Sequence, residues 1–145
     1  MSQCIIRRIK PEDYHDIHEL NVKVGYQYDE SKVKDRILNI LDSGSELILV
    51  AELDNKVIGY IHGTPYNTLY SDSLVSIVQF VFDHEHREDR ELTLQIFKEF
   101  EKLVRKNGYH GIRMAADADR KVLYELMTEY HFENKRDLKH YIKFF

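Results

Sequence analysis

The sequence contains one cysteine, two prolines, six glycines and no tryptophan among its 145 residues. A single thiol, Cys4, cannot form an intrachain disulfide, so the fold does not depend on one. No run of about 18 apolar residues is present, which argues against a transmembrane helix and a membrane partner. The first apolar stretch is too short for a secretory signal. The expectation is therefore a cytoplasmic protein.

The sequence also has no excess of positively charged side chains over negatively charged ones. Lys and Arg total 21 against 25 Asp and Glu, which gives a formal net charge of −4. A nucleic-acid-binding domain depends on Lys and Arg contacts to phosphates, so we expect no nucleic-acid partner. The chain has the length of one ordinary domain, and its few prolines and glycines mark no linker. A single domain spanning residues 1–145 is predicted.

The spacing of apolar residues alternates between the period of a strand and that of a helix. Short apolar runs predict strands at 5–9, 47–53, 57–64, 74–82 and 111–116, with extended structure again at 132–145. Apolar residues three or four positions apart predict helices at 11–25, 31–43, 89–106 and 119–129. Ser31 is the expected N-cap of the second helix, and residues 54–56 form the expected hairpin turn. The predicted fold class is α/β (α+β): a mixed, mostly antiparallel sheet of six to seven strands with about four helices.

Four short segments carry a family resemblance. Val50-Ala51-Glu52 leads through the hairpin to Val57-Ile58-Gly59, and Phe82-Asp83-His84-Glu85-His86-Arg87 ends the fourth predicted strand. Asn107-Gly108-Tyr109 follows the long helix, and His131-Phe132 follows the last one. In order and spacing these segments resemble the GNAT superfamily, the acetyl-CoA-dependent N-acetyltransferases, over nearly the whole chain. The family ends its fourth strand with hydrophobic-x-Pro-Glu-x-Arg and has Gly-Phe where this chain has His-Phe.

The resemblance implies transfer of an acetyl group from acetyl-CoA to a primary amine of a small molecule or peptide, with no metal. In the family a base removes the amine proton, and a backbone amide beside a splayed fourth strand stabilises the oxyanion. The cofactor pyrophosphate binds backbone N–H groups at the start of the long helix. Carried over to this chain, the cofactor-binding candidates are Phe80, Val81, Phe82, Arg87, Asp89, Arg90, Glu91, Leu92, Thr93 and Arg120.

The expected pyrophosphate loop lacks the family's glycines, which let the backbone approach phosphate closely. Arg90 and Leu92 stand in the glycine positions, or Glu91 and Thr93 do if the loop carries one extra residue. Residues 87–91 include two positive and three negative side chains, a sum of −1. In one interpretation Asp89 and Glu91 cap the helix and occupy its first turn. In the other, the two arginines bind phosphate while backbone N–H groups still hold the pyrophosphate.

The family's catalytic tyrosine lies five residues before the phenylalanine of Gly-Phe, and that position is Met127 here. A thioether cannot donate a proton. Tyr124, three residues earlier, is the equivalent acid if the helix is one turn longer, and otherwise it is a packed aromatic residue. A cofactor-contacting asparagine of the family falls on Arg120, or on Asp117 if Tyr124 is the equivalent residue.

Family members often place the substrate base near the end of the fourth strand, which Gln79 and Asp83 bracket here. Because an amide cannot act as a base, the candidates are Asp83, Glu85 and His84. In an extended segment His84 and His86 lie on one side, but without an apparent third ligand no metal site is expected.

The sequence says less about the amine that accepts the acetyl group and about a protein partner. Four tyrosines (Tyr26, Tyr28, Tyr66 and Tyr70) either form aromatic walls for a hydrophobic or cationic amine or pack at the surface. Asp29, Glu30 and Asp72 add negative charge that favours a basic acceptor. The apolar residues 141–145 predict a last strand, paired either within the sheet or across a homodimer. The alternative function is a catalytically degenerate GNAT-fold protein that binds acyl-CoA or a protein partner.

Overall fold

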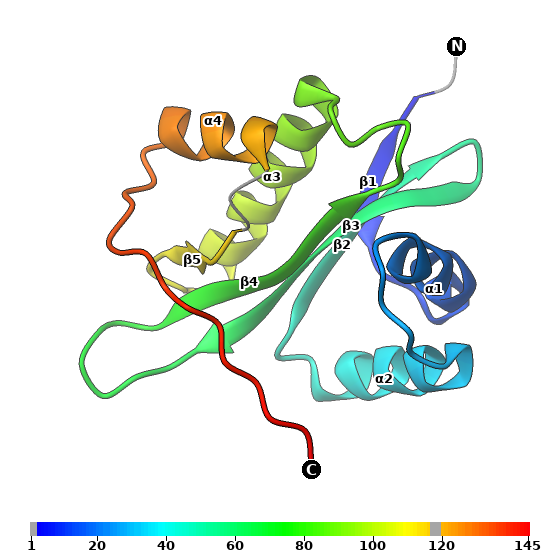
Figure 1. Ribbon diagram of the computed structural model, residues 1–145, viewed down its shortest axis with the longest axis horizontal. Helices are drawn as coiled ribbons and strands as arrows, with labels where there is room; N and C mark the ends of the chain where they lie inside the picture. Colours follow the sequence, from blue (N-terminus) through cyan, green and yellow to red (C-terminus); the bar gives the residue numbers. More distant parts are fainter. Residues whose placement is uncertain (1–2, 117–119) are drawn as a thin grey trace. The chain divides into compact units, whose positions relative to one another are not determined.

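The computed structural model describes residues 3–116 and 120–145 (Figure 1). Contacts divide the chain into two units, Met1–Met114 and Ala115–Phe145. The first unit contains β1 (Ile5–Arg8), α1 (Tyr14–Lys23), α2 (Glu30–Ser43), β2 (Leu47–Leu53), β3 (Lys56–Tyr66), β4 (Leu74–Phe82), α3 (Arg90–Lys106) and β5 (Ile112–Met114). A 3-10 turn, Pro11–Asp13, precedes α1, and the second unit contains α4 (Lys121–Glu129). None of the described helices combines the length and apolar character needed to cross a bilayer.

The five strands form one sheet in the order β1-β2-β3-β4-β5. The first three pairings are antiparallel and the β4–β5 pairing is parallel, so the prediction of a mixed, mostly antiparallel sheet is confirmed. The turn between β2 and β3 contains two residues, not three. Asp54 and Asn55 both have positive φ, 52° and 64°, as the tight hairpin turns with right-handed strand twist require.

Helices cover both faces of the sheet: α1 and α2 lie on one face and α3 on the other (Figure 1). The core of the first face combines residues of α1, α2 and the sheet, among them Ile17, Leu20, Ile37, Val50, Tyr60 and Val81. On the second face α3 buries six side chains at helical spacing (Leu92, Thr93, Ile96, Phe97, Phe100 and Val104). The strong amphipathic pattern that predicted this helix thus reflects a buried face.

Two further predictions about elements are wrong. Five strands, not six to seven, occur among the described residues, because residues 132–145 form no strand. Apart from the half-buried Phe132 their side chains are exposed, so neither cross-strand pairs nor burial stabilise the β-branched and aromatic residues there. The N-cap of α2 is Asp29 rather than Ser31, since the helix already begins at Glu30. Asp119, the predicted start of the last helix, lies outside the described residues.

Candidate active site

β4 is paired on both sides at only three of its nine residues. It pairs with β5 from Val75 to Ile77, opposite Ile112–Met114, and with β3 as far as Phe82. From Val78 to Phe82 no described strand pairs with the β5 side of β4. Backbone N–H and C=O groups on this side of β4 have no partner strand among the described residues, so the edge is suited to bind an extended ligand.

A β-bulge lies where the edge opens. His62 faces Gln79 across the β3–β4 ladder, but the next residue of β3, Gly63, faces Ile77. Val78 is therefore the extra residue, and 55% of it is exposed. A bulge bends its strand and redirects the side chains around it, and bulges are frequent next to functional sites.

The side chain of Gln79 connects the open edge to the α1/α2 face of the sheet. Its Oε1 accepts the N–H of Phe80 at 3.1 Å, and the side chain also hydrogen-bonds to the Tyr60 hydroxyl. That hydroxyl donates to Asn21 Oδ1 at 2.6 Å. Burial raises the pKa of Tyr60 well above its usual value and Tyr26 adds to the rise, which the bonds to Gln79 and Asn21 oppose. Tyr60 therefore remains a neutral phenol at physiological pH.

The same face carries a histidine–glutamate pair that the sequence analysis missed. His62 follows Tyr60 by two residues on β3, so both side chains lie on one face. His62 Nε2 lies 2.7 Å from Oε1 of Glu46, which precedes β2, and the two side chains are 19% and 26% exposed. Alternation along β3 was the available signal, but sixteen residues separate the two partners, so only the fold brings them together.

Beyond the bulge this face also carries a cation. Arg113 of β5 donates to Ser76 Oγ at 3.0 Å and lies 4.4 Å from the centre of the Tyr66 ring. Of the four tyrosines singled out in the sequence, Tyr66 therefore contacts an arginine, and its hydroxyl is 3.4 Å from that of Tyr70. Tyr26 lies near Tyr60. The Tyr28 hydroxyl instead accepts a hydrogen bond from Arg36 of α2 at 3.4 Å.

The predicted base candidates lie on the loop after β4. Asp83 Oδ1 is 2.5 Å from His86 Nδ1 and also accepts the His86 N–H, so this carboxylate orients an imidazole. His84 and Glu85 are exposed. The structure therefore joins Asp83 to His86 and leaves the other two candidates at the surface.

At the start of α3 the capping interpretation of Asp89 is confirmed. Asp89 Oδ1 accepts the N–H of Leu92 at 3.0 Å, and its main-chain oxygen accepts the Thr93 hydroxyl at 2.8 Å. The side chains of Leu92 and Thr93 are buried, so these residues can contact a ligand only through backbone atoms. The side chains of Arg87 and Arg90 are exposed. A carboxylate thus uses one of the N–H groups that an anion would bind.

The remaining predicted positions divide between the two units. Phe80, Val81 and Phe82 are buried, so they can contact a ligand through backbone atoms alone. In the second unit Arg120 is the N-cap residue of α4, and Tyr124 is 40% exposed and donates to the main-chain oxygen of Ala116 at 3.0 Å. Asp117, the alternative to Arg120, lies outside the described residues.

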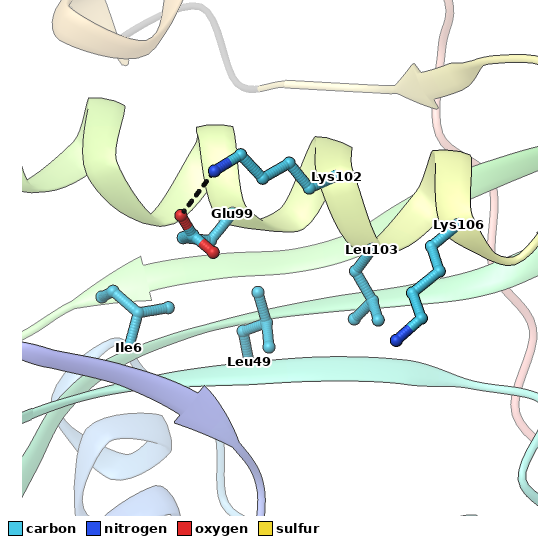
Figure 2. A pocket seen from close by; sticks show the side chains of 6 residues that line it. All are labelled: Ile6, Leu49, Glu99, Lys102, Leu103 and Lys106. Carbon is cyan, nitrogen blue, oxygen red and sulfur yellow. Dashed lines mark hydrogen bonds and ion pairs between the residues drawn. The ribbon is translucent and has the colours of Figure 1, made fainter.

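Two other features do not belong to this region. A shallow hollow of about 220 Å³ lies between α3 and strands β1 and β2 (Figure 2), lined by Ile6, Leu49, Glu99, Lys102, Leu103 and Lys106. Strand β3 separates it from β4. His15, Asp16 and Glu19 place ligand atoms within 4.8 Å of one another, but each has a protein partner: Glu30, the Val57 N–H and Lys56 respectively.

Comparison with known proteins establishes the fold. No protein-family model and no curated protein matches the sequence. Among solved structures, the aminoglycoside N-acetyltransferase AAC(6')-Iy in complex with CoA matches 99% of this chain and 96% of its own with a TM-score of 0.81 and 14% identity. Glucosamine-6-phosphate N-acetyltransferase from Arabidopsis thaliana matches 98% and 99% with a TM-score of 0.81 and 15% identity. A transcriptional regulator from Bacillus halodurans matches 97% and 100% with a TM-score of 0.80 and 17% identity.

The chain has the GNAT acetyltransferase fold. At identities of 14–17% the likeness concerns the fold, and function must come from the site. β4 parts from β5 after Ile77, at the place where the resemblance led us to expect a splayed fourth strand. The loop from β4 to α3 stands where a pyrophosphate loop was expected. The residues fit acetyl-CoA unevenly: the open edge of β4 offers backbone groups for an extended ligand, whereas Asp89 opposes an anion at the start of α3.

Proposed function

We propose that this protein is an N-acetyltransferase that moves an acetyl group from acetyl-CoA to a primary amine of a small molecule or peptide. The observation that carries the proposal is the open edge of β4 from Val78 to Phe82, which begins at a bulge beside the polar face of Tyr60, Gln79 and His62. It is supported by the same fold in AAC(6')-Iy, known in complex with CoA and with a CoA-S-monomethyl-acetylneamine bisubstrate analogue.

In this proposal the donor runs along β4 to the start of α3. Backbone groups of residues 80–82 hold its pantetheine arm, and Arg87, Arg90 and the backbone of 90–93 hold its pyrophosphate, with Arg120 as a further contact. Bound acetyl-CoA supplies the activated acetyl thioester. The Phe80 N–H, at which Gln79 Oε1 now accepts, is the backbone donor that we assign to the developing oxyanion.

The acid role is proposed for Tyr124, whose hydroxyl would protonate the departing thiolate. A free thiol has a pKa near 8.5, so the thiolate is a tolerable leaving group and loss of this hydroxyl should weaken catalysis without abolishing it. Asp83 and Glu85 are the residues that the sequence suggests as the base that removes the amine proton. Because Asp83 holds His86, it would act through that imidazole.

The acceptor is proposed to bind on the α1/α2 face beside the bulge. Tyr26 and Tyr66 supply aromatic surface there for an amine, consistent with neighbours whose names specify aminoglycosides and glucosamine-6-phosphate as substrates. The nature of the amine is the subject of the experiment below.

The test of cofactor binding is a melting curve across a titration of acetyl-CoA, with S-acetylpantetheine, which lacks the pyrophosphate, as the matched control ligand. Acetyl-CoA at 100 times its Kd should stabilise the fold by about 2.7 kcal/mol, roughly 8 °C for a chain of this size. A saturable shift is then followed by release of CoA with a panel of primary amines. Binding without transfer would favour the degenerate, acyl-CoA-binding alternative. A flat response at millimolar acetyl-CoA would refute the proposal.

A homodimer is also proposed. Tyr141, Ile142, Phe144 and Phe145 are 66–114% exposed, and burying such residues against a second copy would remove apolar surface from water. Light scattering should give the mass of two chains for the wild type and of one for the double variant I142D/F144D. A wild type that stays monomeric at about 100 times the protein concentration used in the activity assay would contradict this proposal.

A further inference from the structure

We infer that the general base for the acceptor amine is His62, held and polarised by Glu46. This inference rests on the proposed function and deepens it, because it assigns the proton acceptor at the acceptor face. It replaces the sequence-based assignment to the loop after β4. The geometry that carries it is the pairing of His62 with Gln79 across the two strands at the bulge.

His62 lies opposite Gln79, the residue of β4 whose amide side chain cannot act as a base. Gln79 is an amide, but its partner across the β3–β4 ladder is His62, and directly opposed residues have Cβ atoms about 5 Å apart on one face. The same face is where Gln79 meets the Tyr60 hydroxyl and where the edge of β4 begins to open. A proton acceptor on β3 thus lies within one side-chain length of the start of the open edge.

Asp83 is farther from this point. It follows Gln79 by four residues, which corresponds to about 13 Å along an extended strand. Its carboxylate is bonded to His86 on the loop toward α3, where the donor's phosphates are proposed to bind. The acid–imidazole pair at Asp83 therefore belongs to the donor side, and the pair at Glu46 belongs to the acceptor side.

The pairing with Glu46 also sets the tautomer of the neutral imidazole. With Nε2 donating its hydrogen to Glu46 Oε1, the lone pair lies on Nδ1, for which the described residues provide no hydrogen-bond partner. In the reaction the amine nitrogen bonds to the thioester carbonyl carbon, the C–S bond breaks, and the amine proton passes to Nδ1. The resulting imidazolium is stabilised by the Glu46 carboxylate.

Among the described residues, four other ionisable side chains are placed on this face of the sheet by their contacts. Glu46 is its direct partner, Tyr60 on β3 and Tyr26 from the α1–α2 loop are phenols, and Arg113 is committed to Ser76 and Tyr66. Asn21 and Gln79, the other polar groups at Tyr60, do not titrate. A pH effect that disappears with His62 can therefore be assigned to this imidazole.

The test needs no identified acceptor, because water can replace the amine. Acetyl-CoA hydrolysis to acetate and CoA is measured for the wild type, H62Q and E46Q from pH 5 to 9, together with the Kd of acetyl-CoA. H62Q should lower the rate about 100-fold or more and remove the acidic limb of the pH profile, and E46Q should lower it about tenfold, with the Kd unchanged. H15Q is the matched control. His15 also contacts a glutamate, Glu30, at 2.6 Å, but its side chain lies on α1 and is 60% exposed. The hydrolysis rate of H15Q should therefore equal that of the wild type.

The outcomes separate the two proposals. If the wild type binds acetyl-CoA but H62Q hydrolyses it as fast and with the same pH profile, or if D83N and not H62Q removes the acidic limb, the assignment to His62 is wrong and the acetyltransferase proposal stands. A wild type that binds acetyl-CoA yet neither hydrolyses nor transfers the acetyl group also overturns the assignment. Failure to bind acetyl-CoA overturns the proposed function and the base assignment with it.

Discussion

Asp89 Oδ1 accepts the N–H of Leu92 at 3.0 Å, so α3 begins with a carboxylate bonded to its own first turn. The resemblance to GNAT enzymes led us to expect a pyrophosphate at this helix start, with glycines before it. In this chain the cap stabilises the helix and at the same time places negative charge where two more charges would bind. In the proposed function, the stability of the cap and the affinity for acetyl-CoA therefore oppose each other at Asp89.

Replacing Asp89 separates the two effects. Asparagine caps helices about as well as aspartate, so D89N should leave the Tm nearly unchanged, whereas D89A should cost about 1 kcal/mol. Both variants remove a negative charge, and both should bind acetyl-CoA about fivefold more tightly at low ionic strength, a gain of roughly 1 kcal/mol. Calorimetric titration at 20 mM and 500 mM NaCl measures this, since the gain should shrink as salt screens the charge.

An unchanged acetyl-CoA affinity in both Asp89 variants would show that the pyrophosphate does not approach the start of α3. The control ligand is S-acetylpantetheine, whose affinity should be the same in the wild type and D89N because it carries no pyrophosphate.

Cys4 reports on the same carboxylate. Burial raises the pKa of the Cys4 thiol above its usual value, and the charge of Asp89 raises it further. D89N should therefore lower this pKa and speed alkylation by iodoacetamide at pH 8, because the thiolate is the reactive form. Cys4 is the single cysteine of the sequence, so mass spectrometry follows one site. E91Q, which removes an exposed acid two residues away, should leave the alkylation rate unchanged; equal acceleration in both variants would contradict a specific contact.

Arg7 and Asp13 tie β1 to the turn before α1. The guanidinium donates to both carboxylate oxygens at 2.8 and 2.9 Å, and the Lys10 N–H donates to Oδ2 at 2.7 Å. Burial alone would raise the pKa of Asp13, but the bonds from Arg7 and Lys10 outweigh it and the pKa is lowered. D13N should lower the free energy of unfolding by about 2 kcal/mol at pH 7, measured by urea denaturation.

The pH dependence of that difference follows from the sign of the shift. Because the folded pKa of Asp13 is below its usual value, the carboxylate contributes its full stability above the usual value, near 4, and loses it as the pH falls through the folded pKa. The wild type and D13N should therefore differ by a constant amount above about pH 5 and converge at lower pH. A difference that grows on acidification would contradict the network. E52Q, whose bond to Arg7 is longer at 3.3 Å, should have the smaller effect.

Gly63 stands where β3 meets α3. A Cβ atom there would lie 2.5 Å from both Phe100 Cζ and Val75 Cγ1, and both neighbours are buried. G63A should therefore lower the free energy of unfolding by about 1–3 kcal/mol, read from thermal or urea unfolding. G111A offers a comparison, since its nearest neighbour is a Leu74 side-chain atom at 3.0 Å, and the cost should be smaller. Equal stability of the wild type and G63A would mean that the packing of α3 adjusts freely.

Local pattern was sufficient for most of the secondary structure. β4 was predicted with its observed bounds, Leu74–Phe82, and α3 to within one residue, because each concentrates apolar residues at one period. The prediction failed at 132–145, where β-forming residues find no neighbouring strand. It also failed at Ser31, because Asp29, two residues earlier, is already the N-cap of the helix. Propensity describes what a segment prefers, and pairing decides whether that preference is realised.

The sequence by itself determined the order of elements as far as α4, the mixed α+β class and the absence of glycines from the loop before α3, since each depends on neighbouring residues. It also supplied Asp89 as a cap, which is a contact across three positions. Only the tertiary structure decided where β4 parts from β5, that Gln79 joins the edge to Tyr60, and that Glu46 meets His62. Those contacts join residues 16 or more positions apart, or depend on one extra residue in a ladder, and local periodicity carries no information about either.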